Sequence, residues 1–457
     1  AGIAVAEVRG VTQPPTLDDL VGCRISGVGE VSGDFRCSND LLNWLHNAVR
    51  RTQSNNVTYL PNENSREYKA WTQDIQNMFR SAVYLFDSQT MYERWQYDMT
   101  DVQAPDGNFP NVAPGPVYDP YNSPWWGGTA VWLPWHWYLY YGDSSLLQDS
   151  YAGLKRYVDF LAQQSPSGIQ DWGLSDWYSR VDAGRPVVNT PAAIFFARIV
   201  SETASMLGRA EEAKHYAELS EKIKRAFNAG YLDLNRGVYG VPRKNYEGEG
   251  ASWPTTQIKG AEIKDPDNLM PLGERRCTQG GQVLPLMLDV VPVEFRQKVK
   301  DALLAQIKAD KNMLTTGFVA TPYLLAWLGE HAPATGWALT TTREYPSWYS
   351  MSVGSDSEQM METWDGGMVS MPSLGGNLGG WNIETLAGIR PDPAGPGFKR
   401  FIIKPAIVGN LHWTEGWYDS VRGRIECKWR KRGGQFQMTV AIPANTMATV
   451  YVPTKDA

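Results

Sequence analysis

The chain has 457 residues, a formal net charge of −6 and no lysine- or arginine-rich run that would form a basic stripe. This length suits two to four domains or one large closed barrel, and the charge argues against a nucleic-acid partner. The content of 19 Trp and 22 Tyr against only 5 His suits sugar recognition, because an indole offers a flat apolar face to a pyranose.

No run of about 18 apolar residues is present, so we expect no membrane-spanning helix. The four cysteines, Cys23, Cys37, Cys277 and Cys427, are widely spaced and form no C-x-x-C pair, which argues against a zinc site, although Cys23 and Cys37 are close enough to bridge. We expect no metal and no cofactor. Because the first methionine is Met78, we expect that an initiator methionine, a signal peptide or upstream domains were removed. The sequence is compatible with a secreted, periplasmic or cytoplasmic protein of any oligomeric state.

The predicted elements change character twice along the chain. Residues 1–38 are expected to be extended or irregular, because Gly and Pro interrupt the β-branched residues. From residue 39 onward, apolar residues recur at helical spacing, as in Leu42, Leu45 and Val49. The segments "AAIFFARIVSETASMLG" and "EEAKHYAELSEKIKRAFNAGY" are separated by a short break, which indicates an antiparallel helix hairpin.

Long loops rich in Gly, Pro and aromatic residues alternate with such short breaks. This alternation is typical of a closed ring of helix hairpins whose long loops all lie at one end, and loops of this length are usually functional. Residues 39–396 suffice for twelve helices, so we predict a mainly α fold with an (α/α)6 barrel. Residues 397–457 alternate polar and apolar side chains and turn at Gly433-Gly434, which predicts a small C-terminal antiparallel β-sandwich domain.

Two acidic residues in the long loops are candidates for catalysis. Glu67 lies in "ENSREYKAWTQD", just before a predicted helix, with Trp71 four residues later, and Glu362 lies in "MMETWDGG", with Trp364 two residues later. Two carboxyl groups that face each other across a pocket are the minimal equipment for glycoside cleavage, and a neighbouring Trp helps to raise the pKa of the acid. The alternative is structural, since an acid near a helix N-terminus stabilises the helix dipole by about 0.3–1 kcal/mol.

The same loops resemble those of the α-L-rhamnosidases of glycoside hydrolase family 78. The blocks "NSREYKAWTQD", "LSDWYS", "EYPSWYSM", "ETWDGG" and "IPANTMATVYVP" follow in the family's order, and the resemblance covers about residues 35–455. It implies an (α/α)6 barrel with a C-terminal β-sandwich and a metal-free inverting hydrolysis, with Glu67 as general acid and Glu362 as general base. Residues that we expect to contact the substrate are Arg66, Trp71, Asp74, Trp126, Trp172, Asp176, Trp177, Trp348 and Trp364, with Trp71, Trp126, Trp172 and Trp177 as the pocket wall.

The chain departs from the family pattern at three polar positions. An Asp of the family falls on Pro61, a second Asp is replaced in Gly128-Thr129, and a sugar-binding His falls near Pro372. We therefore expect an altered sugar specificity, with Asn62, Glu63 and Asn64 as candidate replacements for the missing contacts. By the resemblance, we expect none of the family's usual N-terminal β domains within these residues.

Three functions follow from these observations. The first is an exo-acting glycoside hydrolase that releases terminal α-L-rhamnose or a related sugar from a plant or algal glycan or a glycoside. The second is a lyase that cleaves rhamnosyl-uronate linkages by β-elimination, with a loop arginine to bind the uronate and a loop tyrosine as base. The third is a non-catalytic carbohydrate-binding barrel, although the retention of both acids argues against it. The lyase candidates are Arg66, Arg180, Arg343, Tyr178 and Tyr349.

Overall fold

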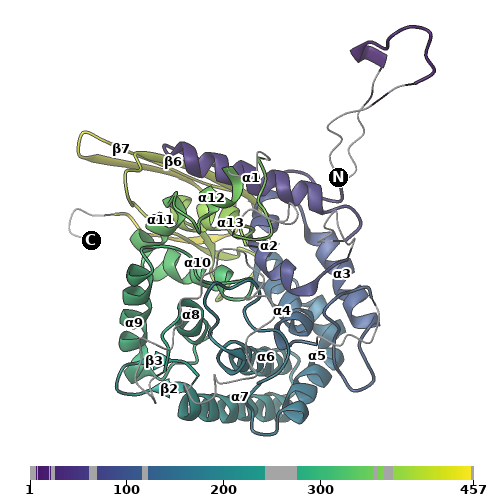
Figure 1. Cartoon of the computed structure of the whole chain (residues 1–457), viewed down its shortest axis with the longest axis vertical. Helices are drawn as coiled ribbons and strands as arrows, with labels where there is room; N and C mark the ends of the chain where they lie inside the picture. The colour runs from purple at the N-terminus through teal and green to yellow at the C-terminus, as the bar shows by residue number, and fades with distance from the viewer. Residues whose placement is uncertain are drawn as a thin grey trace.

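Helices alternate between an inner and an outer ring in the computed structural model of the chain (Figure 1). It describes residues 7, 9–19, 21, 26–60, 69–115, 122–241, 275–353, 358–364 and 374–453. Each inner helix contacts the next, and the last contacts the first, so the ring closes. The inner helices are α2 (Thr72–Leu85), α4 (Pro124–Tyr141), α6 (Arg185–Met206), α8 (Gln279–Met287), α10 (Ala320–His331) and α13 (Leu378–Trp381).

The outer helices pack against this ring and complete six helix pairs within the described part of the chain. This arrangement confirms the predicted (α/α)6 barrel. A further short helix, α12 (Trp348–Val353), lies in the connection before α13. The outer helices are α1 (Asp40–Asn56), α3 (Gln89–Asp101), α5 (Ser145–Gln164), α7 (Ala210–Tyr231), α9 (Arg296–Ala309) and α11 (Pro333–Thr341).

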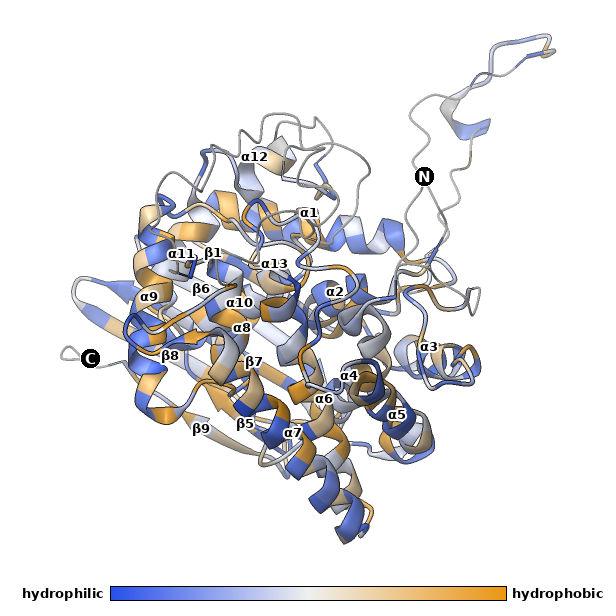
Figure 2. Cartoon of the chain, turned by 60° about the horizontal axis from the view of Figure 1, so that its bottom comes forward, coloured by the Kyte–Doolittle hydropathy of each residue, from blue (hydrophilic) through white to orange (hydrophobic). Residues whose placement is uncertain are grey.

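The two rings differ in the pattern of their apolar residues. Inner helix α4 is buried around most of its circumference because its sequence, "PWWGGTAVWLPW", is apolar on every side. Outer helix α5 buries Leu147, Tyr151 and Leu154 but exposes polar residues on its other side, and Figure 2 shows this mixture of hydrophilic and hydrophobic residues along α5 and α7. Burial of these apolar faces holds the two rings together.

Connection lengths alternate as the sequence predicts. Short connections follow four of the inner helices, at 86–88, 142–144, 207–209 and residue 332. The connections that lead into inner helices are mostly long, namely 57–71, 102–123, 165–184, 232–278 and 342–377, with a shorter one at 310–319. Because paired helices run antiparallel, these connections all reach the end of the barrel where the inner helices begin. The connection 232–278 also contains the hairpin of β2 (Leu232–Asp233) and β3 (Val238–Tyr239).

The β region contains two sheets. One is antiparallel, in the order β1 (Gly33–Cys37), β6 (Trp413–Ser420), β7 (Gly423–Arg432) and β8 (Gln435–Ala441). The other joins β4 (Ile389–Pro391), β5 (Arg400–Ile403) and β9 (Met447–Val450). In this second sheet β5 and β9 are parallel, which differs from the fully antiparallel domain that we expected.

The β region also extends beyond the predicted boundary of 397–457. Strand β1 comes from the segment 1–38, and β4 begins at residue 389. The predicted turn at Gly433-Gly434 joins β7 to β8, and both glycines have positive φ, +57° and +76°, as a two-residue hairpin turn requires. Among the described helices, none combines the length and the apolar character needed to cross a membrane.

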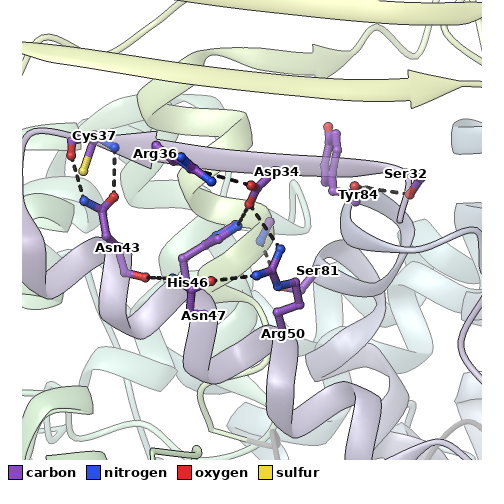
Figure 3. A network of polar contacts seen from close by, with 11 residues as sticks. Ser32, Asp34, Arg36, Cys37, Asn43, His46, Asn47, Arg50, Ser81 and Tyr84 are labelled. Carbon is purple, nitrogen blue, oxygen red and sulfur yellow. Dashed lines mark hydrogen bonds and ion pairs between the residues drawn. The ribbon is translucent and has the colours of Figure 1, made fainter. Parts of the chain in front are cut away.

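Polar contacts attach β1 to the barrel, as Figure 3 shows. The side chain of Asn43 on α1 accepts a hydrogen bond from the backbone N–H of Cys37 (2.9 Å) and donates one to its carbonyl (2.8 Å). The carboxylate of Asp34 lies 3.2 Å from the ring Nε2 of His46 and 3.7 Å from Arg50. Cys37 is buried and its thiol is free. The N-terminal strand therefore bridges α1 and the C-terminal sheet.

Candidate active site

Hydrogen bonds between backbone and side chains join the long connections at one end of the barrel. In the first turn of α2, the hydroxyl of Thr72 donates to the carbonyls of Trp126 (2.7 Å) and Asn111 (3.1 Å). The backbone N–H of Ser123 donates to the side chain of Asn111 (3.1 Å), and the hydroxyl of Ser123 to the carbonyl of Leu174 (3.2 Å). The starts of α2 and α4 and the connection 165–184 are thus held together.

Asp176 is buried and accepts hydrogen bonds from three backbone N–H groups at the start of α10. These bonds come from Gly317 (2.8 Å), Val319 (2.9 Å) and Ala320 (3.0 Å). Burial raises the pKa of Asp176 to about 7, although the three donors oppose this rise. We predicted a substrate contact from sequence, but the structure places this carboxylate as an anchor between the connection 165–184 and α10.

Trp348 and Trp364 are buried, and their indole N–H groups donate hydrogen bonds to backbone carbonyls. The Nε1 of Trp364 donates to Thr316 (3.1 Å) and that of Trp348 to Leu374 (3.0 Å). The two rings lie 5.9 Å apart at an interplanar angle of 66°. These indoles, predicted as substrate contacts, therefore have the geometry of supports for the segment that carries Glu362.

Glu362 lies at this end of the barrel with only 5% of its surface exposed. Its segment is fixed on both sides. The backbone N–H of Met360 donates to the hydroxyl of Thr52 on α1 (2.8 Å), and the indole of Trp364 is bonded to Thr316. Glutamate is seldom buried to this degree unless it is paired or functional. The position therefore suits a reactive carboxyl group.

Several predicted residues lie outside the described residues, namely Arg66, Glu67, Pro61, Asn62, Glu63, Asn64 and Pro372. By sequence, Glu67 belongs to the connection 57–71, which ends at the start of α2. Trp71, immediately before α2, is partly buried and forms an antiparallel bridge with Val112. The ammonium group of Lys69 lies 5.9 Å from the centre of the Trp71 ring. Asp74 is buried in the first turn of the same helix.

The other predicted wall residues differ in exposure. Trp126 is buried in α4. Trp172 is partly buried, and its indole N–H donates to the side chain of Gln170 (2.8 Å). Trp177 is partly buried and packs edge-on against Tyr178 at 5.4 Å. Of the predicted wall, Trp71, Trp172 and Trp177 keep surface that a ligand can contact.

The arginines and tyrosines proposed for the lyase contact aromatic neighbours. The guanidinium group of Arg180 lies 4.8 Å from the ring centre of Tyr345, and that of Arg343 lies 4.9 Å from the ring centre of Tyr349. The ring of Tyr178 packs against Phe318 at 5.6 Å. These contacts assign the side chains packing roles.

Gly128 stands at one of the positions where the chain departs from the family pattern, and its surroundings leave no space for the family's Asp. A Cβ atom at this position would lie 2.0 Å from the buried ring of Phe196 on α6, so there is no room for a side chain. The neighbouring Thr129 has a structural role, because its hydroxyl accepts a hydrogen bond from Gln76 (2.8 Å). The close packing of α4 against α6 therefore fills the space that an acidic side chain at position 128 would need.

Sequence reasoning overlooked the amide side chains of α2. Gln73, Gln76 and Asn77 are fully buried on an inner helix of the barrel. The segment "TQDIQNMF" carries the signal that could have identified them, since polar residues stand there on several sides of a helix that must be buried. Among the described residues, no group of three His, Cys, Asp or Glu side chains could hold a metal ion.

Comparison with known families decides the relationship. Residues 30–381 match the bacterial alpha-L-rhamnosidase 6 hairpin glycosidase domain, and residues 388–457 match the bacterial alpha-L-rhamnosidase C-terminal domain. The chain belongs to the bacterial alpha-L-rhamnosidase family. This confirms the resemblance identified from the loop motifs.

Several of the similar proteins are named alpha-L-rhamnosidases. One from Streptomyces avermitilis is 27% identical, with 99% of this chain and 42% of the relative aligned. The structure of an alpha-L-rhamnosidase from Dictyoglumus thermophilum matches with a TM-score of 0.82 and 27% identity, over 98% of this chain and 48% of that one. The Streptomyces avermitilis enzyme complexed with L-rhamnose matches with a TM-score of 0.79 and 26% identity, over 93% and 39%. The chain thus spans about half the length of these relatives or less, and their names lend no support to the lyase alternative.

Proposed function

We propose that this chain is the catalytic region of an exo-acting, inverting glycosidase that releases terminal α-L-rhamnose or a related sugar from a glycan or glycoside. The observation that carries the proposal is the buried Glu362, whose segment is held between α1 and the connection 310–319, where the long connections of the barrel meet. The names of the family and of the relatives, one of them complexed with L-rhamnose, support the choice of sugar.

In this proposal the two glutamates divide the chemistry. Glu362 acts as general base and takes a proton from the water that attacks the anomeric carbon, while Glu67 acts as general acid and protonates the departing oxygen. Inversion requires about 6.5–9.5 Å between the two carboxyl groups, so that the water fits between base and sugar. The partly exposed indoles of Trp71, Trp172 and Trp177 supply flat apolar faces for the C–H side of the ring.

Kinetics of Glu362→Gln test the assignment of the base. We expect kcat on p-nitrophenyl α-L-rhamnoside to fall by about 10²- to 10⁴-fold, because the attacking water loses its proton acceptor. Glu358→Gln is the matched control. Its side chain is 73% exposed, and its 3.5 Å ion pair with Arg51 is a surface contact of little energetic value. Full activity of Glu362→Gln would contradict the proposal.

The acid is tested by comparing leaving groups. p-Nitrophenolate departs with little protonation, whereas a sugar alcohol needs a proton. Glu67→Gln should therefore lose more activity on a rhamnose-capped oligosaccharide than on the nitrophenyl substrate. Equal losses on both substrates would contradict the role of Glu67. On a rhamnose-capped uronic-acid polysaccharide, ultraviolet absorbance from an unsaturated uronate would indicate elimination instead.

A further inference from the structure

Three amide side chains at the starts of α2 and α13 form a group that we call the amide cluster: Gln73, Asn77 and Asn377. Their exposed fractions are 0%, 0% and 4%. Within the part of the chain that the structure describes, both amide atoms of Gln73, both of Asn77 and the Oδ1 of Asn377 have no hydrogen-bond partner. The cluster thus combines several unpaired donors and acceptors near the N-terminal ends of two adjacent inner helices.

This absence of partners is unusual in a native fold. Buried polar groups are nearly always hydrogen-bonded, because an unpaired buried group keeps the full cost of its desolvation. The neighbouring Gln76 follows this rule, since its Nε2 donates to the carbonyl of Trp125 (3.1 Å) and the hydroxyl of Thr129 (2.8 Å). The same helix therefore pairs one buried amide and leaves two others without a partner among the described residues.

Contacts on either side of α2 show where the unpaired amides face. Gln76 bonds to α4, while the hydroxyl of Ser81 accepts a hydrogen bond from the backbone N–H of Gly380 on α13 (2.8 Å). At 3.6 residues per turn, Gln73 and Asn77 lie between these two sides and so face the barrel axis. Both lie near the N-terminal end of α2, where the long connections meet.

The amide cluster is also linked to the segment that carries Glu362. The Nδ2 of Asn377 donates to the backbone carbonyl of Gln76 (3.5 Å). Three residues before Asn377, the carbonyl of Leu374 accepts the indole hydrogen bond of Trp348, which packs on Trp364. The cluster and Glu362 thus belong to the same end of the barrel.

We propose that the amide cluster binds neighbouring hydroxyl groups of the terminal sugar and determines which sugar the site accepts, an inference that rests on the proposed function. A side-chain amide offers a donor and an acceptor together, as a hydroxyl group does. The cluster carries no charge, and the next polar residue on this side of α2, Arg80, is already paired with Glu384 of the π-helix η5 (Asn382–Ala387) at 3.2 Å. It therefore suits a neutral sugar and not a uronate. Because the amides are shielded from solvent in this conformation, an entering sugar must uncover them.

Isothermal titration with a panel of sugars tests this inference. The panel is L-rhamnose, L-fucose, D-mannose, D-glucose and D-glucuronate, titrated into the wild type, Gln73→Met and Asn77→Leu. We expect the wild type to bind a neutral member, and both variants to weaken its Kd by about 10- to 100-fold and to raise KM similarly. The Tm should stay the same or rise, because each variant removes an unpaired buried amide while nearly keeping its volume.

Gln282→Met on α8 is the matched control. Both amide atoms of Gln282 are paired with the backbone of Tyr239, at 2.9 and 2.8 Å. This variant should lower the Tm and leave the Kd unchanged, the opposite of the two test variants.

The outcomes separate the two proposals. An unchanged Kd in both test variants, or a loss of Tm like that of the control, would overturn the role of the amide cluster even if rhamnoside hydrolysis is intact. If the wild type binds a neutral sugar but hydrolyses no rhamnoside, the proposed function fails, while loss of that binding in the variants still supports the cluster. Preference for D-glucuronate, or no binding of any sugar in the panel, would overturn the inference.

Discussion

At the residue scale, a side chain of the type that binds sugars can instead be paired with another group of the protein. Asp176 has the residue type and the loop position of a sugar ligand, yet its oxygens are bound to three N–H groups at the start of α10. Trp348 and Trp364 have the residue type of a substrate contact, but the indole N–H groups of both donate to backbone carbonyls in the interior. Glu362 is also buried, and we propose its carboxyl group as the general base.

Replacement of Asp176 should destabilise the fold. Asp176→Ala would leave three backbone N–H groups buried without an acceptor, at about 1–3 kcal/mol each. We therefore expect the free energy of unfolding to fall by about 3 kcal/mol or more, measured by denaturant unfolding or as a lower Tm. Asp171→Ala, an exposed residue of the same connection, is the control and should change stability little. Equal stability of the two variants would contradict the anchoring role.

At the scale of elements, the packing of α4 against α6 depends on a missing side chain. The ring of Phe196 fills the space that a Cβ at Gly128 would need, and it packs edge-on against Trp125 at 5.8 Å. Inner helices of the barrel therefore approach each other closely at this point. This contact also leaves no room for an acidic side chain at position 128.

Gly128→Ala should destabilise the protein by about 1–3 kcal/mol, because the buried Phe196 ring must move. Phe196→Leu should also destabilise it, but the double variant should recover part of the loss, since the smaller side chain leaves room for the new methyl group. Thermal unfolding of the wild type, the two single variants and the double variant measures this coupling. Strictly additive losses would contradict the proposed steric conflict.

The sequence predicts the helices and turns better than it predicts strand pairing or the contacts of buried side chains. Hydrophobic periodicity and the alternation of connection lengths suffice for the (α/α)6 barrel, and the Gly433-Gly434 turn was predicted because it depends on local backbone conformation. The pairing of β1 with β6 joins residues almost four hundred positions apart, so no local pattern reveals it. Likewise, the unpaired amides of Gln73 and Asn77 appear only when the neighbours of α2 are known.

At the scale of the whole molecule, the β region is built from segments on both sides of the barrel in the sequence, and it packs against the barrel. Strand β1 precedes α1 and completes the sheet of β6, β7 and β8, so the N-terminal segment and the C-terminal domain are held against the same side of the barrel. The interior of the sheet contacts the barrel, since the indole of Trp429 on β7 donates to the carbonyl of Leu386 (2.9 Å). This hydrogen bond attaches the end of η5, which directly follows α13, to the sheet.

The central claim is that Glu362 and Glu67 together cleave a rhamnoside by direct attack of water. The most direct test is ¹H NMR of the sugar that the wild-type chain releases from p-nitrophenyl α-L-rhamnoside in the first minutes, before the anomers equilibrate. The account predicts β-L-rhamnose as the first product, because a water held by Glu362 attacks from the face opposite the leaving group. Release of α-L-rhamnose first, or no release of rhamnose, would contradict it.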